Sequence, residues 1–89
     1  MKIPEISGGH HMTRVNLRHM KVDQTGTIKS VKAEGELGRR IRDMGLVPGT
    51  QVTIKGRAPL QDPVALRLLG FTLTLRNNEA DYIDVEVDG

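Results

Sequence analysis

The segment that decides the fold reads ELGRRIRDMGLVPGTQVTIK and runs over residues 36–55. In its first part, Leu37, Ile41 and Met44 occupy positions i, i+4 and i+7. Side chains at this spacing lie on one side of an α-helix, and the charged residues between them lie on the other sides. The pattern predicts a short amphipathic helix over residues 36–44.

A turn and a strand are predicted directly after this helix. Gly45 stands where a left-handed residue commonly ends a helix. Pro48-Gly49 is typical of the second and third positions of a type II turn. Beyond the turn, Val52 and Ile54 alternate with polar residues over residues 50–55, which is the pattern of a half-buried strand.

The rest of the chain is rich in strand patterns. The predicted strands are residues 25–32, residues 64–69, residues 72–76 and a C-terminal run in which Ile83, Val85 and Val87 point inward. In the first of them Ile28 and Val31 are three positions apart, so a β-bulge is needed to keep both on the inner face. Gly70-Phe71 predicts a tight hairpin between the second and the third.

These elements add up to a mainly β domain of about five strands. A one-turn helix is predicted over about residues 78–82, with Asn77 or Asn78 as its cap. Two prolines, Pro59 and Pro63, indicate a stiff loop between two strands. Because an open sheet of this size would expose both edges, a small, partly closed β-barrel is favoured.

The first 20 residues lack a sustained pattern, so residues 1–20 are expected to be a flexible leader and residues 21–89 the folded domain. Part of the leader is expected to be either derived from a vector or upstream of the natural start. At 89 residues the chain is long enough for one domain.

Charge is distributed unevenly along the chain. Residues 1–57 contain eleven Lys or Arg against five Asp or Glu, whereas residues 58–89 contain two against six. The halves therefore carry +6 and −4, and together they give the net charge of +2. A basic first half favours an acidic partner, either a nucleic acid or an acidic protein surface.

Residues that could carry out catalysis or bind a metal are few. The chain has no cysteine, and its three histidines, His10, His11 and His19, all fall in the expected leader. Adjacent histidines in a mobile segment do not preorganise a coordination sphere, so adventitious metal binding is the most we expect of them. No nucleophile with a base is found, and no apolar run approaches the ~18 residues of a membrane span. We therefore expect no enzyme activity, no cofactor, no specific metal site and no membrane insertion.

Three separated blocks resemble the FeoA family, ferrous iron transport protein A. They are residues 38–50 (GRRIRDMGLVPGT), residues 58–63 (APLQDP) and residues 75–80 (LRNNEA), and the resemblance covers roughly residues 24–88. Gln61 departs from it, since the family more often has glycine there. The resemblance implies an SH3-like barrel in the cytoplasm, at the inner face of the membrane beside FeoB, the permease with a GTP-binding domain. It implies an accessory or regulatory role in ferrous iron uptake, by protein contact.

The expected contact surface combines the arginines of the helix with apolar residues near it. The candidate residues are Arg39, Arg40, Ile41, Arg42, Leu46, Val47, Pro59 and Leu60. Ile41 is expected to be a core residue first, and Leu46 and Val47 to be exposed beside the arginines.

Two other readings remain open. One is an SH3-like nucleic-acid or regulator module related to the C-terminal domain of iron-dependent repressors, although we expect no DNA-binding helices before it and Phe71 and Tyr82 are the sole aromatic residues. The other is weak self-association through an edge strand.

Overall fold

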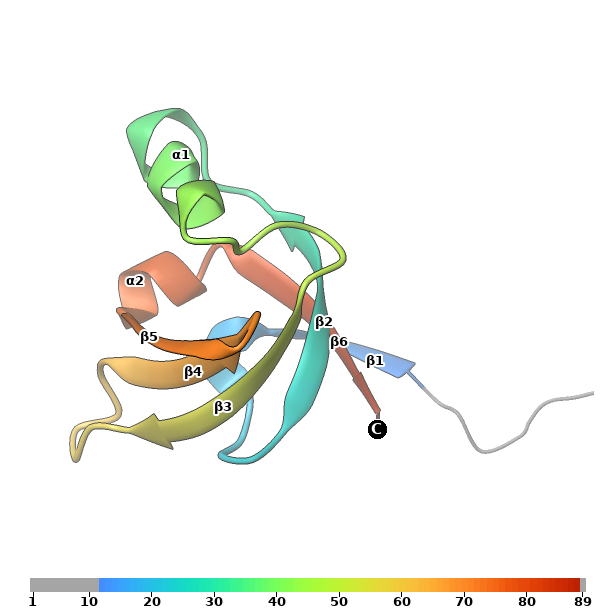
Figure 1. Ribbon diagram of the computed structural model, residues 1–89, viewed down its shortest axis with the longest axis vertical. Coiled ribbons are helices and arrows are strands. Elements are labelled where there is room, and N and C mark those ends of the chain that lie inside the picture. Colours follow the sequence, from blue (N-terminus) through green and yellow to red (C-terminus); the bar gives the residue numbers. More distant parts are fainter. Residues whose placement is uncertain (1–11, 89) are drawn as a thin grey trace, which may run out of the picture.

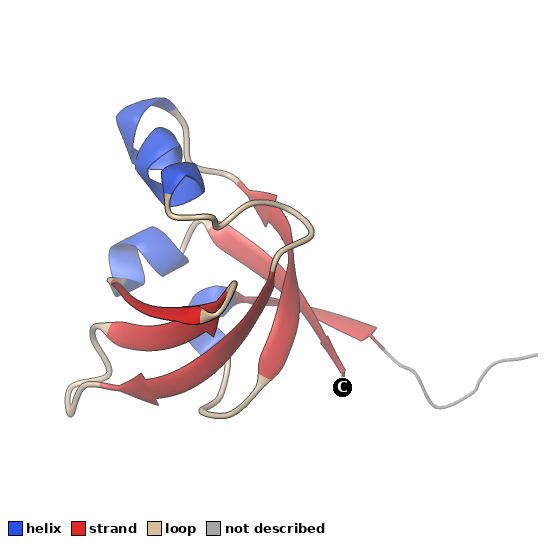
Figure 2. Ribbon diagram, viewed as in Figure 1, coloured by secondary structure: helices blue, strands red, loops and turns tan. Residues whose placement is uncertain are grey.

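The computed structural model describes residues 12–88, which form one antiparallel sheet with three short helical segments. The strands follow the order β1-β6-β2-β3-β4-β5. They are β1 (Met12–Asn16), β2 (Thr25–Val31), β3 (Gln51–Arg57), β4 (Val64–Leu68), β5 (Phe71–Leu75) and β6 (Ile83–Asp88). The helices are η1 (Leu17–His19), α1 (Gly35–Asp43) and α2 (Asn77–Ala80). Figures 1 and 2 show a strongly curved sheet with α1 and α2 at one end of it.

Alternating side chains of the central strands form the core. Val52 and Ile54 of β3, and Ile83 and Val85 of β6, have no exposed surface. The predicted bulge in β2 is confirmed, because the register with β6 shifts between Ile28 and Ser30. The mainly β prediction is thus confirmed, with six strands in place of about five.

The additional strand is β1, which lies inside the expected leader. All five of its residues pair with β6, and Leu17 and Met20 that follow are buried in the core. Arg57 secures this segment, since its Nη2 donates to the carbonyl oxygens of Arg18 at 2.7 Å and Met20 at 2.9 Å. The prediction of a flexible leader is therefore wrong for residues 12–20, and residues 1–11 lie outside the described part of the chain.

Two tight turns were predicted from the sequence, one after α1 and one between β4 and β5. The type II turn after α1 is confirmed, with Thr50 N–H donating to the Val47 carbonyl at 3.0 Å and Gly49 at φ 96°. The β4–β5 hairpin turns at Leu69 and Gly70, one residue earlier than predicted, with φ values of 51° and 85°. Glycine adopts such a φ freely, but Leu69 does so at a steric cost.

The one-turn helix α2 covers residues 77–80, against the expected 78–82, and its cap differs from the prediction. Glu79, in place of an asparagine, caps the first turn, because its Oε1 accepts from the Arg76 N–H at 3.0 Å. Asn77 instead holds the β3–β4 loop: its N–H donates to Asp62 Oδ1 at 3.0 Å, and its Nδ2 donates to the Gln61 carbonyl at 3.1 Å.

Candidate functional site

The candidate surface is built around α1, whose end is fixed by hydrogen bonds. Gly45 at φ 93° donates its N–H to the Arg42 carbonyl at 2.9 Å, and Leu46 donates to the Ile41 carbonyl at 3.3 Å. This pair of bonds is the Schellman motif, in which the residue after the glycine packs back on the last turn. Ile41 and Leu46 accordingly have no exposed surface, and they anchor α1 to the core.

The structure divides the eight predicted contact residues into exposed and buried ones. Those exposed are Arg39, Arg40, Arg42, Val47, Pro59 and Leu60, whereas Ile41 and Leu46 are buried. Leu60 is the most exposed of the large hydrophobic residues within residues 12–88, at 89%. The expectation that Leu46 is exposed is wrong, because the Schellman motif turns it inward. Ile41 is confirmed as a core residue, so neither of the two presents a contact surface.

The exposed residues form two patches instead of one. Figure 1 shows α1 and the β3–β4 loop, which carries Pro59 and Leu60, at different ends of the molecule with α2 between them. Arg39 and Arg42, three positions apart, share one side of α1. We call the exposed face with Arg39 and Arg42 the arginine face of α1; Val47 is exposed in the turn that follows the helix.

α2 connects the two patches. On one side Asn77 binds the β3–β4 loop, and on the other Glu79 Oε2 accepts from Arg40 Nη2 at 2.9 Å. Glu79 is only 7% exposed, whereas the Arg40 side chain is 67% exposed. Both carboxylate oxygens of Glu79 are thus used, one to cap α2 and one to hold α1 against it.

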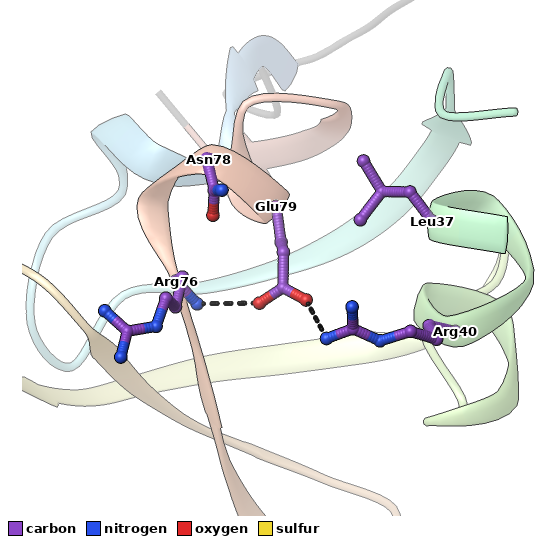
Figure 3. A pocket seen from close by; sticks show the side chains of 5 residues that line it. All are labelled: Leu37, Arg40, Arg76, Asn78 and Glu79. Carbon is purple, nitrogen blue, oxygen red and sulfur yellow. Dashed lines mark hydrogen bonds and ion pairs between the residues drawn. The ribbon is translucent and has the colours of Figure 1, made fainter.

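A pocket of about 300 Å³ lies between α1 and α2. It is lined by Leu37, Arg40, Arg76, Asn78 and Glu79. Figure 3 shows Leu37 pointing in from α1, and the guanidinium of Arg76 directed away from the Glu79 carboxylate. Two arginines against one carboxylate give the pocket a net positive charge, which favours an acidic group.

Sequence reasoning missed the role of Glu79. Glu79 supplies one half of a capping box, in which a glutamate at the third helical position accepts from the N–H of the capping residue. The sequence signature of a capping box is absent, because it needs Ser or Thr at the cap and this position is Arg76. Nothing local in the sequence indicates its second partner, Arg40, which is 39 positions away.

Gln61 occupies a position with a positive φ of 67° in the β3–β4 loop. Glycine adopts this conformation without steric cost, which explains physically why a glycine suits the position. The departure at Gln61 therefore puts a residue with a steric cost at this position of the loop.

Clusters typical of metal sites are not found in residues 12–88: no three His, Asp, Glu or Cys side chains converge. His19, in η1, is exposed, and His10 and His11 lie outside the described residues. No helix within residues 12–88 combines the length and the apolar character that a bilayer crossing requires. What the described surface offers is charge and apolar contact.

Comparison with known proteins identifies the family. The FeoA domain model matches residues 15–87. The chain belongs to the FeoA family. A relative from Porphyromonas gingivalis, described as a fusion of Fe(2+) transport protein A and the Fe(2+) transporter FeoB, is 33% identical over 73 residues. The match covers 82% of this chain and 9% of that longer protein.

Solved structures confirm the fold. The FeoA-like protein from Clostridium acetobutylicum aligns with a TM-score of 0.78 at 40% identity, over 83% of this chain and 86% of its own. Stenotrophomonas maltophilia FeoA, described as a prokaryotic SH3 domain protein in complex with zinc, aligns with a TM-score of 0.70 at 24% identity, over 80% of this chain and 88% of its own. The SH3-like prediction is therefore confirmed. T. acidophilum IdeR shares the fold, with a TM-score of 0.75 at 24% identity, over 84% of this chain and 34% of its own.

Proposed function

We propose that this chain is a non-catalytic accessory protein of ferrous iron uptake. In this proposal it acts in the cytoplasm, at the inner face of the membrane, by binding the cytosolic part of a FeoB-type permease with its GTP-binding domain. One observation carries the proposal: in the Porphyromonas gingivalis relative, FeoA and FeoB form a single polypeptide. Joining two proteins in one chain raises their effective concentration, which benefits partners that bind each other.

The arginine face of α1 is the surface that fits such a contact best. Arg39 and Arg42 are exposed and form no ion pair among residues 12–88, so they are available to an acidic partner. Val47, 36% exposed, offers an apolar contact in the turn that follows α1. Apolar residues at the centre of a charged rim are typical of protein interfaces.

The test is binding of the purified cytosolic part of the permease, measured by calorimetry, to the wild type and to two variants. Arg39→Glu/Arg42→Glu reverses the charge of the arginine face, and Leu60→Ala shortens the apolar residue of the β3–β4 loop. Lys55→Glu, which reverses an exposed charge on β3, two strands away from β5, is the control. We expect the double variant to lose at least tenfold in affinity and the control to keep it, while thermal melts verify that each is folded.

Binding of all variants with unchanged affinity would place the contact elsewhere, and no binding to the wild type would contradict the proposed function itself. The basic arginine face also supports a nucleic-acid module as a second candidate. That candidate predicts a shift of DNA or RNA at low salt that weakens steeply as salt increases. Absence of any shift at low salt eliminates it.

A further inference from the structure

The strand β5 is one of the two edges of the sheet, and it is the less protected one. It pairs with β4 on one side, and no hydrogen bond outside the sheet involves Thr72 or Thr74 among the described residues. Both threonines are exposed. Figure 1 shows β5 at the end of the sheet, close to α2.

The hairpin decides which backbone groups point to the open edge. Leu68 pairs with Phe71 across a two-residue turn, so these two residues exchange both of their backbone hydrogen bonds. Backbone groups alternate along a strand, so Leu73 bonds to β4 as Phe71 does. The N–H and C=O groups of Thr72 and Thr74 therefore point away from β4, ready to pair with another strand.

The sequence of this edge does nothing to prevent such pairing. Proteins commonly protect edge strands with charged residues, proline or a bulge. Residues 68–75 (LLGFTLTL) contain neither charge nor proline, and the register of β4 with β5 is regular. The opposite edge, β1, carries the exposed Arg14. The two edges of the sheet thus differ in the protection that their side chains give.

The pocket between α1 and α2 begins where β5 ends, and this continuity indicates the kind of occupant. Arg76 follows β5 directly and lines the pocket with Arg40 and Leu37. The Arg76 guanidinium forms no ion pair within the described residues. A segment that lies along β5 would carry its next side chains to two arginines and one leucine, which suit an acidic and an apolar residue.

We propose that an extended segment of the permease's cytosolic part, with an acidic residue at one end, binds as an added strand along β5 and places that residue against the Arg76 guanidinium, since Arg40 is already paired with Glu79. The inference rests on the proposed function and adds a second contact with the same partner, at the β5 edge as well as at the arginine face of α1. Main-chain hydrogen bonds with Thr72 and Thr74 supply affinity, and the pocket supplies selectivity.

The experiment is hydrogen exchange of backbone amides by NMR on the full chain, with and without the cytosolic part of the permease, combined with affinities of edge variants. The Thr72 and Thr74 amides are expected to exchange rapidly in the free protein and at least tenfold more slowly in the complex. Thr74→Pro removes one outward N–H, as edge strands tolerate. We expect it to weaken binding at least tenfold, and its control, Thr74→Val, which keeps the N–H, to stay within about twofold.

The outcomes separate this inference from the proposed function. Binding to the wild type without protection of the two amides overturns the added strand and leaves the proposed function intact. Absence of binding to the wild type overturns both. Protection of the same amides that increases with protein concentration, without the permease, overturns the permease segment in favour of a second copy of this chain. The exchange measurement on the wild type decides the matter even if Thr74→Pro does not fold.

Discussion

Replacing Gly38 with alanine tests how closely α1 packs against the segment that enters it. Gly38 lies within α1 and is buried. A Cβ at this position would lie 2.9 Å from the carbonyl carbon of Ala33, closer still to its oxygen, and 2.9 Å from Arg42 Nη2. Arg42 is exposed and can move, but the Ala33 carbonyl belongs to the backbone and cannot move without displacing the entry to α1.

Two effects of opposite sign compete in Gly38→Ala. Alanine is better than glycine in a helix interior by about 1 kcal/mol. Forcing a methyl group into filled space typically costs about 1–3 kcal/mol, and contact with backbone belongs at the upper end. The steric cost is therefore expected to win, with a net loss of about 1–2 kcal/mol. For a domain of this size that lowers the Tm by roughly 5–15 °C.

The assay is urea and thermal unfolding followed by far-UV circular dichroism. Gly56→Ala in β3 is the matched control, because no atom lies within 4 Å of its added Cβ and its φ lies outside the range that strains other residues. It should leave stability unchanged or raise it by up to about 1 kcal/mol, since alanine restricts the unfolded chain. A Gly38→Ala protein as stable as the wild type would refute the close approach described for α1.

Three other substitutions test features of the fold. Leu69→Asn should raise stability by about 1 kcal/mol in the same unfolding assay, because asparagine tolerates φ 51° better than leucine and Leu69 is 71% exposed. A loss of stability would show that the Leu69 side chain packs better than its exposure suggests. Glu79→Gln should lower the free energy of unfolding by about 1–3 kcal/mol, because the amide has a single oxygen and can accept from only one of the two donors. Arg40→Ala should lower it by less than about 1 kcal/mol. Equal losses for the two variants would contradict the dual role of Glu79. Arg57→Ala should lower the free energy of unfolding by about 2 kcal/mol and accelerate amide hydrogen exchange in β1 before the other strands. Exchange that accelerates equally in all strands would contradict a local role of Arg57 in holding β1.

Local signals in the sequence explain which elements could be predicted. The apolar spacing of Leu37 and Ile41, the glycine after the helix and the alternation in β3 and β6 each depend on neighbours within a few positions. β1 has no such signal, since Val15 is its one inward aliphatic residue and its partner β6 lies near the other end of the chain. Long-range pairing of this kind is set by tertiary structure, and a single sequence does not display it.

The candidate surface was predicted less well than the fold, for two physical reasons. Leu46 and Val47 are adjacent apolar residues, and which of them turns inward depends on the hydrogen bonds after Gly45. The Schellman rule, which pairs Leu46 with Ile41, could have resolved that choice. The separation of the β3–β4 loop from α1 arises from α2, which lies between them. No pattern in the sequence indicates that arrangement.

The position of β6 in the sheet has a consequence for how the protein is made. β6 is the last strand of the described residues, yet it lies between β1 and β2 and pairs with both. Until β6 has been synthesised, β1 has no partner and β2 pairs only with β3, at residues 25–27. The β3–β4–β5 meander can form early, because its contacts are local. β1 can pair only once β6, residues 83–88, has left the ribosome, so the sheet is completed after all of its other strands have been synthesised.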